Sequence, residues 1–303
     1  MYKSQHYKFI TTPLSKILED GVNACRGIGN GIETYPLCDY IMQSIFLKMT
    51  GAQEQKMKCI CWEIATNDYE YRYEYLRNTK KDYGEFSKYD QKNKVYKSLL
   101  LQIKQIDGKF DIDDFCWIKP NDKDVVDALV DMKVKQSIYV QQKKNKQVPN
   151  CQGQEKMRNS FRNQIQTQLQ KEGSTNKDFF ILILKQHINN MLQDTSLSIW
   201  QYNGFSIFKE STFFSEKNFA SRSSILENDL KKIYENDVIV HRHRCAHNIT
   251  SYQQNLPTLD TLASPDYIYH NYFFRFAILI LIDEIFICLY KKYVEALENT
   301  INW

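Results

Sequence analysis

The chain has few residues that break helices. Its 303 residues include only 10 glycines and 6 prolines. Lys, Glu, Gln and Leu are frequent instead, and these residues lose little side-chain freedom in a helix. The composition therefore predicts a mostly α-helical fold. A hydrophobic content of 43% and a charged content of 25% are ordinary globular values, and the length suffices for one large domain or two small ones.

A membrane-spanning run is also missing. The most apolar segment is YFFRFAILILIDEIFICLYKKY (272–293), but Arg275, Asp283 and Glu284 interrupt it. A transmembrane helix needs about 20 apolar residues, so we expect a buried helix here and no membrane partner. The first residues, MYKSQHYKFITT, have no apolar centre of the kind found in signal peptides. We therefore expect a cytoplasmic protein.

The eight cysteines are scattered, and none of their spacings predicts a metal site or a disulfide framework. Cys59 and Cys61 form the one close pair, and a single C-x-C is a poor zinc signal. Reduced thiols are the simplest interpretation. The net charge of +4 permits a polyanionic partner such as RNA without requiring one.

Apolar residues recur at helical spacing along most of the chain. Segments 35–51 and 53–78 are predicted to form a helical hairpin in which Gly51 ends the first helix. Tyr69, Tyr71, Tyr73 and Tyr75 alternate, which could indicate a strand, but we favour a helix with two rows of tyrosines. Further helices are predicted at 86–107, 121–140 (capped by Asn121), 154–173, 177–192, 221–248 and about 266–297.

The polar stretch 141–154 is the best candidate for a linker, because it lacks periodicity and contains Pro149 and Gly153. It predicts an N-terminal helical region, 1–145, and a C-terminal helical domain, 150–303. The Asn-Gly pair at 203–204 predicts one small β-hairpin.

Histidines and arginines gather in VIVHRHRCAHN (238–248), at the predicted C-terminal end of a helix. One interpretation is a solvated basic helix end, because the helix dipole favours cations there. A second is a metal site, since His243 and His247 stand four residues apart on one face. Ile239 and Asn236, one turn earlier, supply no good third ligand, and we predict no metal or other cofactor.

The third interpretation is RNA cleavage by Arg242 and His247. Histidine titrates near neutral pH and can transfer the proton that cleavage requires. Arginine is always charged and can contact two phosphate oxygens of the pentavalent phosphorane at once. The RNA supplies its own nucleophile, the 2′-hydroxyl, so this chemistry needs no metal.

The stretch RHRCAHN, Arg242 to Asn248, resembles the motif of the HEPN superfamily (higher eukaryote and prokaryote nucleotide-binding domains). That motif is an arginine, a polar residue, three further residues and a histidine, here Arg242, His243 and His247. The resemblance implies a helical bundle and a metal-independent endoribonuclease, active as a homodimer and acting as a toxin or antiviral effector in bacterial defence. It implies catalytic roles for Arg242, His247 and His243, and we add RNA contacts by Arg244 and Asn248.

The resemblance equally allows a non-catalytic interpretation. The chain would then be a HEPN-like nucleotide-binding, RNA-binding or dimerisation module that works with an antitoxin or within a defence complex. In that case the N-terminal half would recognise the partner.

Helix geometry leaves a question open. Five residues of an ideal helix turn through about 140°, so Arg242 and His247 do not share a face, whereas His243 and Arg244 lie closer to His247. Either the helix ends before His247, or Arg242 acts across a dimer interface with Arg244 as an auxiliary phosphate contact. For Asp283 and Glu284 we expect an exposed stripe or, alternatively, a carboxylate that orients an active-site Arg or His.

Overall fold

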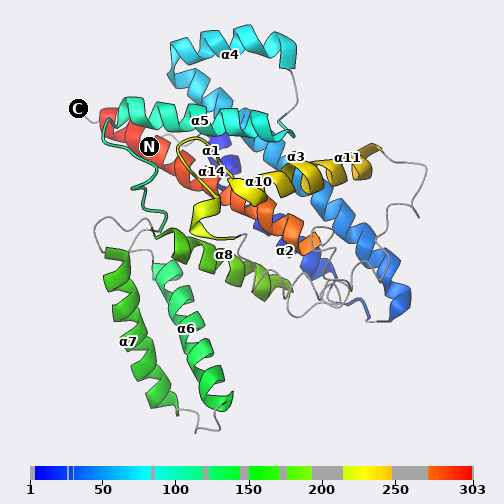
Figure 1. The fold of residues 1–303 in the computed structure, drawn as a ribbon, viewed down its shortest axis with the longest axis vertical. Helices are drawn as coiled ribbons and strands as arrows, with labels where there is room; N and C mark the ends of the chain where they lie inside the picture. Colours follow the sequence, from blue (N-terminus) through cyan, green and yellow to red (C-terminus); the bar gives the residue numbers. More distant parts are fainter. Residues whose placement is uncertain are drawn as a thin grey trace. The chain divides into compact units, whose positions relative to one another are not determined.

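The computed structural model describes residues 4–25, 27–29, 31–82, 86–118, 123–143, 150–170, 176–192, 214–247 and 272–301 (Figure 1). These residues are mostly α-helical, as predicted, and no strand occurs among them apart from a single bridge between Phe219 and Leu226. The helices are α1 (Gln5–Thr11), α2 (Ser15–Ala24), α3 (Tyr35–Asn67), α4 (Tyr69–Asp82), α5 (Tyr89–Ile106), α6 (Lys123–Lys143), α7 (Cys151–Gln170), α8 (Lys177–Leu192), α10 (Asn228–Ile233), α11 (Val240–His247) and α14 (Tyr272–Ile301).

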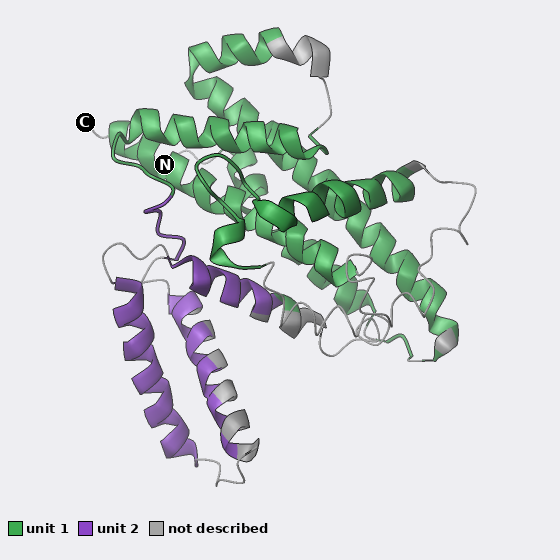
Figure 2. Cartoon of the chain, in the orientation of Figure 1, with its two compact units in different colours: residues 1–112, 188–303 green, residues 113–187 purple. Residues whose placement is uncertain are grey.

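The chain forms two compact units (Figure 2). Unit 1 consists of residues 1–112 and 188–303, and unit 2 of residues 113–187. The boundary predicted between 145 and 150 thus falls inside unit 2, and the regions 1–145 and 150–303 are not the units that the structure has. The polar stretch there separates two helices of one hairpin, since α6 and α7 pack together. Arg158 and Arg162 of α7 form ion pairs with Asp131 and Asp127 of α6.

Unit 1 is built around α14. Residues 272–283 of this helix are all buried, and α14 packs against α1, α3 and α5. Each fully buried Leu, Ile or Phe contributes about 1.5–3 kcal/mol, so this helix supplies much of the core. The predicted buried helix is confirmed, although its expected start near 266 lies outside the described residues. None of the described helices combines the length and the hydropathy that a bilayer crossing requires.

The helical hairpin predicted at 35–78 does not turn at Gly51, so this part of the prediction is wrong. Helix α3 runs without interruption from Tyr35 to Asn67, and Gly51 lies within it. A glycine inside a helix costs only about 1 kcal/mol relative to alanine. The buried face of α3 continues on both sides of Gly51 through Met49, Gln53 and Met57, so packing outweighs that cost.

The chain turns instead at Asp68, where α4 begins. The Asp68 carboxylate accepts a hydrogen bond from the backbone N–H of Tyr71 (2.8 Å) and so caps the new helix. The prediction of a helix with two tyrosine rows is confirmed. Tyr71 and Tyr75 stack with ring centroids 6.0 Å apart, while Tyr69 and Tyr73 are exposed.

The helix predicted over 221–248 begins later than expected. Residues 221–227 are not helical, and α10 starts at Asn228. The reason is local: the Ser221 hydroxyl accepts hydrogen bonds from the backbone N–H groups of Ser223 and Ser224, which competes with helix formation. Asn228 itself has a positive φ of 50°, so the chain enters α10 through a left-handed residue.

Neither expectation for Asp283 holds. Asp283 is fully buried, and its carboxylate pairs with the equally buried Lys56 of α3 (2.7 Å). It also accepts a hydrogen bond from the backbone N–H of Leu14 (2.7 Å). Asp283 therefore ties the N-terminal helices to α3 and α14, because a buried carboxylate must find partners. Glu284 beside it is half-buried rather than exposed.

Candidate functional site

The basic cluster lies on α11, as predicted at a helix end, but a wider turn precedes it. Residues Tyr234–Ile239 form a π-helical segment, η4, between α10 and α11. Such turns are rare and occur often at functional sites. Tyr234 and Val238 of η4 are buried, so this segment fixes the direction in which the residues of α11 point.

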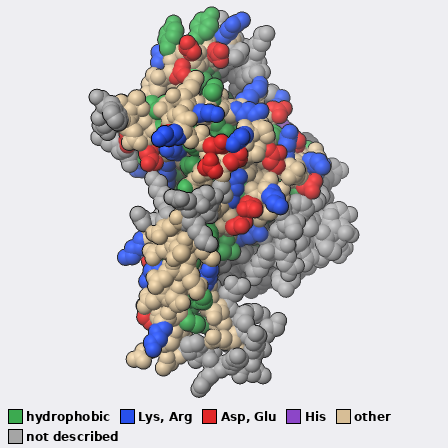
Figure 3. Space-filling model, turned by 60° about the vertical axis from the view of Figure 1, so that its left-hand side comes forward, with side chains coloured by type: hydrophobic (Ala, Val, Ile, Leu, Met, Phe, Trp, Pro, Cys, Tyr) green, Lys and Arg blue, Asp and Glu red, His purple; other side chains and the backbone are tan. Residues whose placement is uncertain are grey.

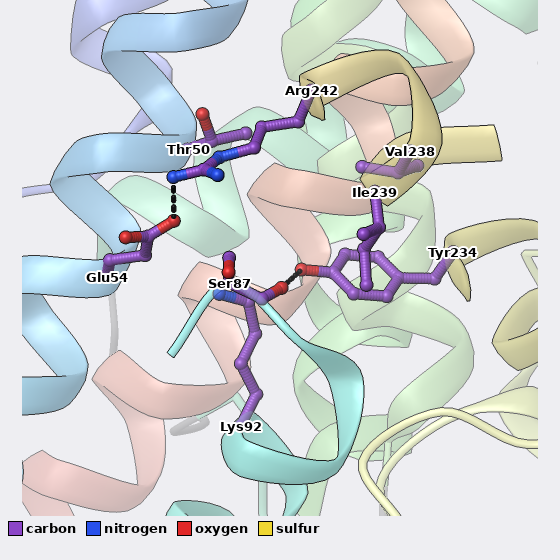
Figure 4. Close-up of a pocket in the computed structure, with 8 residues that line it drawn as sticks. All are labelled: Thr50, Glu54, Ser87, Lys92, Tyr234, Val238, Ile239 and Arg242. Atoms are coloured by element: carbon purple, nitrogen blue, oxygen red, sulfur yellow. Dashed lines mark hydrogen bonds and ion pairs between the residues drawn. The ribbon is translucent and has the colours of Figure 1, made fainter. Parts of the chain in front are cut away.

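Arg242 points toward α3. Its guanidinium contacts the Glu54 carboxylate (Nη2–Oε1, 3.0 Å), and the two side chains are 25% and 12% exposed. Both line a narrow pocket of about 10 Å³, which has room for about one water molecule (Figure 4). Its other walls are Thr50, Ser87, Lys92, Tyr234, Val238 and Ile239. Because an arginine has five N–H donors, pairing with Glu54 orients the guanidinium and leaves donors for a second anion.

Lys92 of α5 lies deep in the same pocket. It is 1% exposed, and its ammonium donates to the backbone carbonyl of Phe86 (2.5 Å). Burial lowers the pKa of Lys92 to about 7; the nearby Glu54 carboxylate acts to raise it and Arg242 to lower it. The pKa of the Tyr234 hydroxyl is raised, chiefly by burial. The pocket thus places a group that can exchange a proton near neutral pH beside Arg242.

Sequence reasoning missed Glu54 and Lys92, although a signal was present. Lys92 falls in the buried row of α5, between Tyr89 and Tyr96, where an apolar residue is expected. Glu54 adjoins the buried row of α3 in the same way. Charged residues on the buried face of a helix must be paired or shifted in pKa, so the pattern alone could have marked both.

His241 belongs to a buried network rather than to the exposed cluster. Its Nε2 lies 3.0 Å from the Tyr272 hydroxyl of α14 and 3.3 Å from the Cys245 sulfur. Its ring packs on Phe46 of α3, with centroids 5.1 Å apart. Burial raises the pKa of the Cys245 thiol to about 11, so this cysteine is not an activated nucleophile. The network holds α11 against α3 and α14.

The other residues of the predicted motif whose side chains the structure describes do not lie beside Arg242 in the pocket. His243 and Arg244 are exposed, on a different side of α11 from the Arg242–Glu54 pair. α11 is helical through His247, whose side chain lies outside the described part, as does all of Asn248. The possibility that the helix ends before His247 therefore does not hold, and the angle of about 140° between Arg242 and His247 remains.

Within the described residues, no three His, Cys, Asp or Glu side chains come together in a way that could hold a metal ion. Comparisons of the chain with protein-family models, with curated proteins and with solved structures found no match.

Proposed function

We propose that the chain is a metal-independent endoribonuclease of the HEPN type. The observation that carries the proposal is the position of Arg242: a permanently charged, partly exposed guanidinium, oriented by Glu54, at the mouth of a pocket. Such a preorganised cation stabilises charge that develops on a phosphorane. His243 and Arg244 lie exposed nearby on the same helix, where an RNA backbone can reach them.

In this proposal the 2′-hydroxyl of the RNA attacks the adjacent phosphorus, and the bond to the 5′-oxygen of the next nucleotide breaks. His247 transfers the protons, Arg242 holds the phosphorane, and His243 gives polar support. Arg244 and Asn248 bind the RNA. The product carries a 2′,3′-cyclic phosphate, and the reaction uses no cofactor.

We further propose a homodimer. Positions 242 and 247 are about 140° apart around α11, so a second chain is the simplest source of a histidine facing Arg242. A cytoplasmic toxin or antiviral effector, restrained by an antitoxin or a defence-complex partner, fits this activity.

One observation favours the second candidate, a non-catalytic nucleotide- or RNA-binding module. Arg242 already has a carboxylate partner in its own chain, as a structural arginine would. Lys92, Glu54 and Tyr234 would then simply form a polar core beside a basic RNA-binding surface.

Expression and cleavage assays separate the two candidates. The wild-type chain should stop bacterial growth, and the purified protein should leave 2′,3′-cyclic phosphate ends on RNA. His247→Ala should do neither while still binding RNA. Binding without cleavage by the wild-type chain would favour the module.

A further inference from the structure

An apolar stripe runs along the outer side of α4. Tyr69, Tyr73 and Leu76 are 77%, 61% and 56% exposed. On a helix these three positions fall within an arc of about 60°, so they form one continuous surface. Figure 3 shows apolar side chains beside acidic and basic ones at the top of the view, where α4 lies.

Other sides of α4 are anchored to its own unit. The Arg72 guanidinium donates to the backbone carbonyls of Ala65 (2.6 Å) and Thr66 (3.1 Å) at the end of α3. Tyr71 and Tyr75 stack on each other and are only partly exposed. The stripe is thus held in place from behind and faces outward on a fixed helix.

The charges beside the stripe are arranged for self-pairing. Glu70 and Arg77 lie two turns apart on the same side of it, separated by only about 20° around the helix. When two copies of a helix pack antiparallel about a two-fold axis, each flank faces the same flank of its partner. An axis between positions 73 and 74 places Glu70 opposite the second copy's Arg77, and this contact occurs twice.

We propose that α4 is a self-association surface that pairs antiparallel with α4 of a second copy of this chain. Tyr73 of each copy lies at the axis, with Tyr69 and Leu76 on either side and a Glu70–Arg77 contact at each end. In a parallel pair, Glu70 would instead lie opposite the flank of the second copy that carries Arg72. That arginine already donates hydrogen bonds to backbone carbonyls of its own chain. This surface lies on a different helix from the α11 motif and does not depend on the proposed nuclease activity.

The expected association is weak. Three side chains of about 150–200 Å² each, partly exposed, bury far less than the roughly 800 Å² per partner of a standard interface. We therefore expect this association only at roughly tens of micromolar protein and above, as a step separate from the homodimer proposed through α11. Because symmetry repeats each change, reversing one flanking charge should weaken association about tenfold.

Sedimentation equilibrium of the full chain at increasing concentration tests this. Glu70→Arg and Arg77→Glu should each weaken this association step, and the double variant Glu70→Arg/Arg77→Glu should restore it. Lys232→Glu, at an exposed charge on α10, is the matched control and should have no effect. Circular dichroism checks that all variants remain helical. Rescue by the double variant cannot arise from misfolding.

Crosslinking tests the orientation. In a background with the exposed Cys116 and Cys151 replaced by serine, Tyr73→Cys should form an intermolecular disulfide. Tyr69→Cys should not form one, because antiparallel packing places position 69 of one copy about 13 Å along the helix from position 69 of the other. Equal crosslinking at both positions overturns the antiparallel arrangement. A chain that shows no such association step, binds a different protein through the stripe, or associates equally in all charge variants overturns the proposal.

Discussion

The buried Lys56–Asp283 pair makes a quantitative prediction about stability. Replacing Lys56 by Met leaves the Asp283 carboxylate without its cation in a site that is 0% exposed. The backbone N–H of Leu14 then remains as a hydrogen-bond donor to this carboxylate. Removing one member of a buried pair typically costs about 3–5 kcal/mol, because the other charge stays buried and uncompensated. For a unit of this size we expect the melting temperature to fall by about 10 °C.

The double variant Lys56→Met/Asp283→Leu is the informative comparison. It removes both charges and fills the space with apolar atoms, so it should recover most of the lost stability. Lys232→Met removes one partner of the exposed Lys232–Asp229 pair (73% and 65% exposed) and should cost less than about 0.5 kcal/mol. Urea denaturation followed by circular dichroism measures all three. If Lys56→Met costs no more than Lys232→Met, the Lys56–Asp283 pair is not buried in solution.

Four further predictions concern the site and the response to pH. Arg242→Ala and His247→Ala should each lower single-turnover RNA cleavage by about 100- to 1000-fold, whereas Arg244→Ala should keep most of its turnover and bind RNA more weakly and with greater salt sensitivity; the reverse ranking would show that the motif is assigned in the wrong register. Cleavage should survive EDTA, and loss of activity with rescue by zinc or manganese would count against the proposed chemistry. Mixing Arg242→Ala chains with His247→Ala chains should restore about a quarter of wild-type activity, since half of the dimers are mixed and each mixed dimer has one complete site; no recovery would show that Arg242 acts within its own chain. Burial raises the pKa values of Asp39, Asp283 and Glu284 to about 6, 6 and 7, so the folded state keeps protons that the unfolded state releases near pH 4. The free energy of unfolding should therefore fall as pH rises from about 4 to 7. Asp283→Asn should make this dependence on pH weaker.

The parts of the fold that follow a local pattern were predictable. The dense apolar run of α14, with too many charges for a membrane span, predicts a buried helix. The paired tyrosines of α4 follow helical spacing. The boundary between the units was not, because it depends on which helices pack together. The polar stretch after α6 looks like a linker in sequence, yet α7 returns to form ion pairs with α6.

The candidate site divides in the same way. The cluster on α11 was visible because His243 and Arg244 are chemically conspicuous. Their partners were not, since Glu54 and Lys92 come from α3 and α5 and reach Arg242 only through tertiary packing. Gly51 misled the prediction for a related reason: its effect on a helix is small, and the buried residues on both sides of it decide the outcome.

The π-helical segment η4 determines how α11 is rotated about its own axis. A π turn holds one more residue than an α turn, and one residue corresponds to about 100° around a helix. Deleting a single residue between Tyr234 and Ile239 would therefore turn α11 about its own axis and carry Arg242 away from Glu54, with no change in the motif itself. In a related chain, a one-residue gap in this segment would therefore mean a different site geometry. The Arg-x4-His spacing after the gap could be intact, and its arginine would still not face the residue equivalent to Glu54.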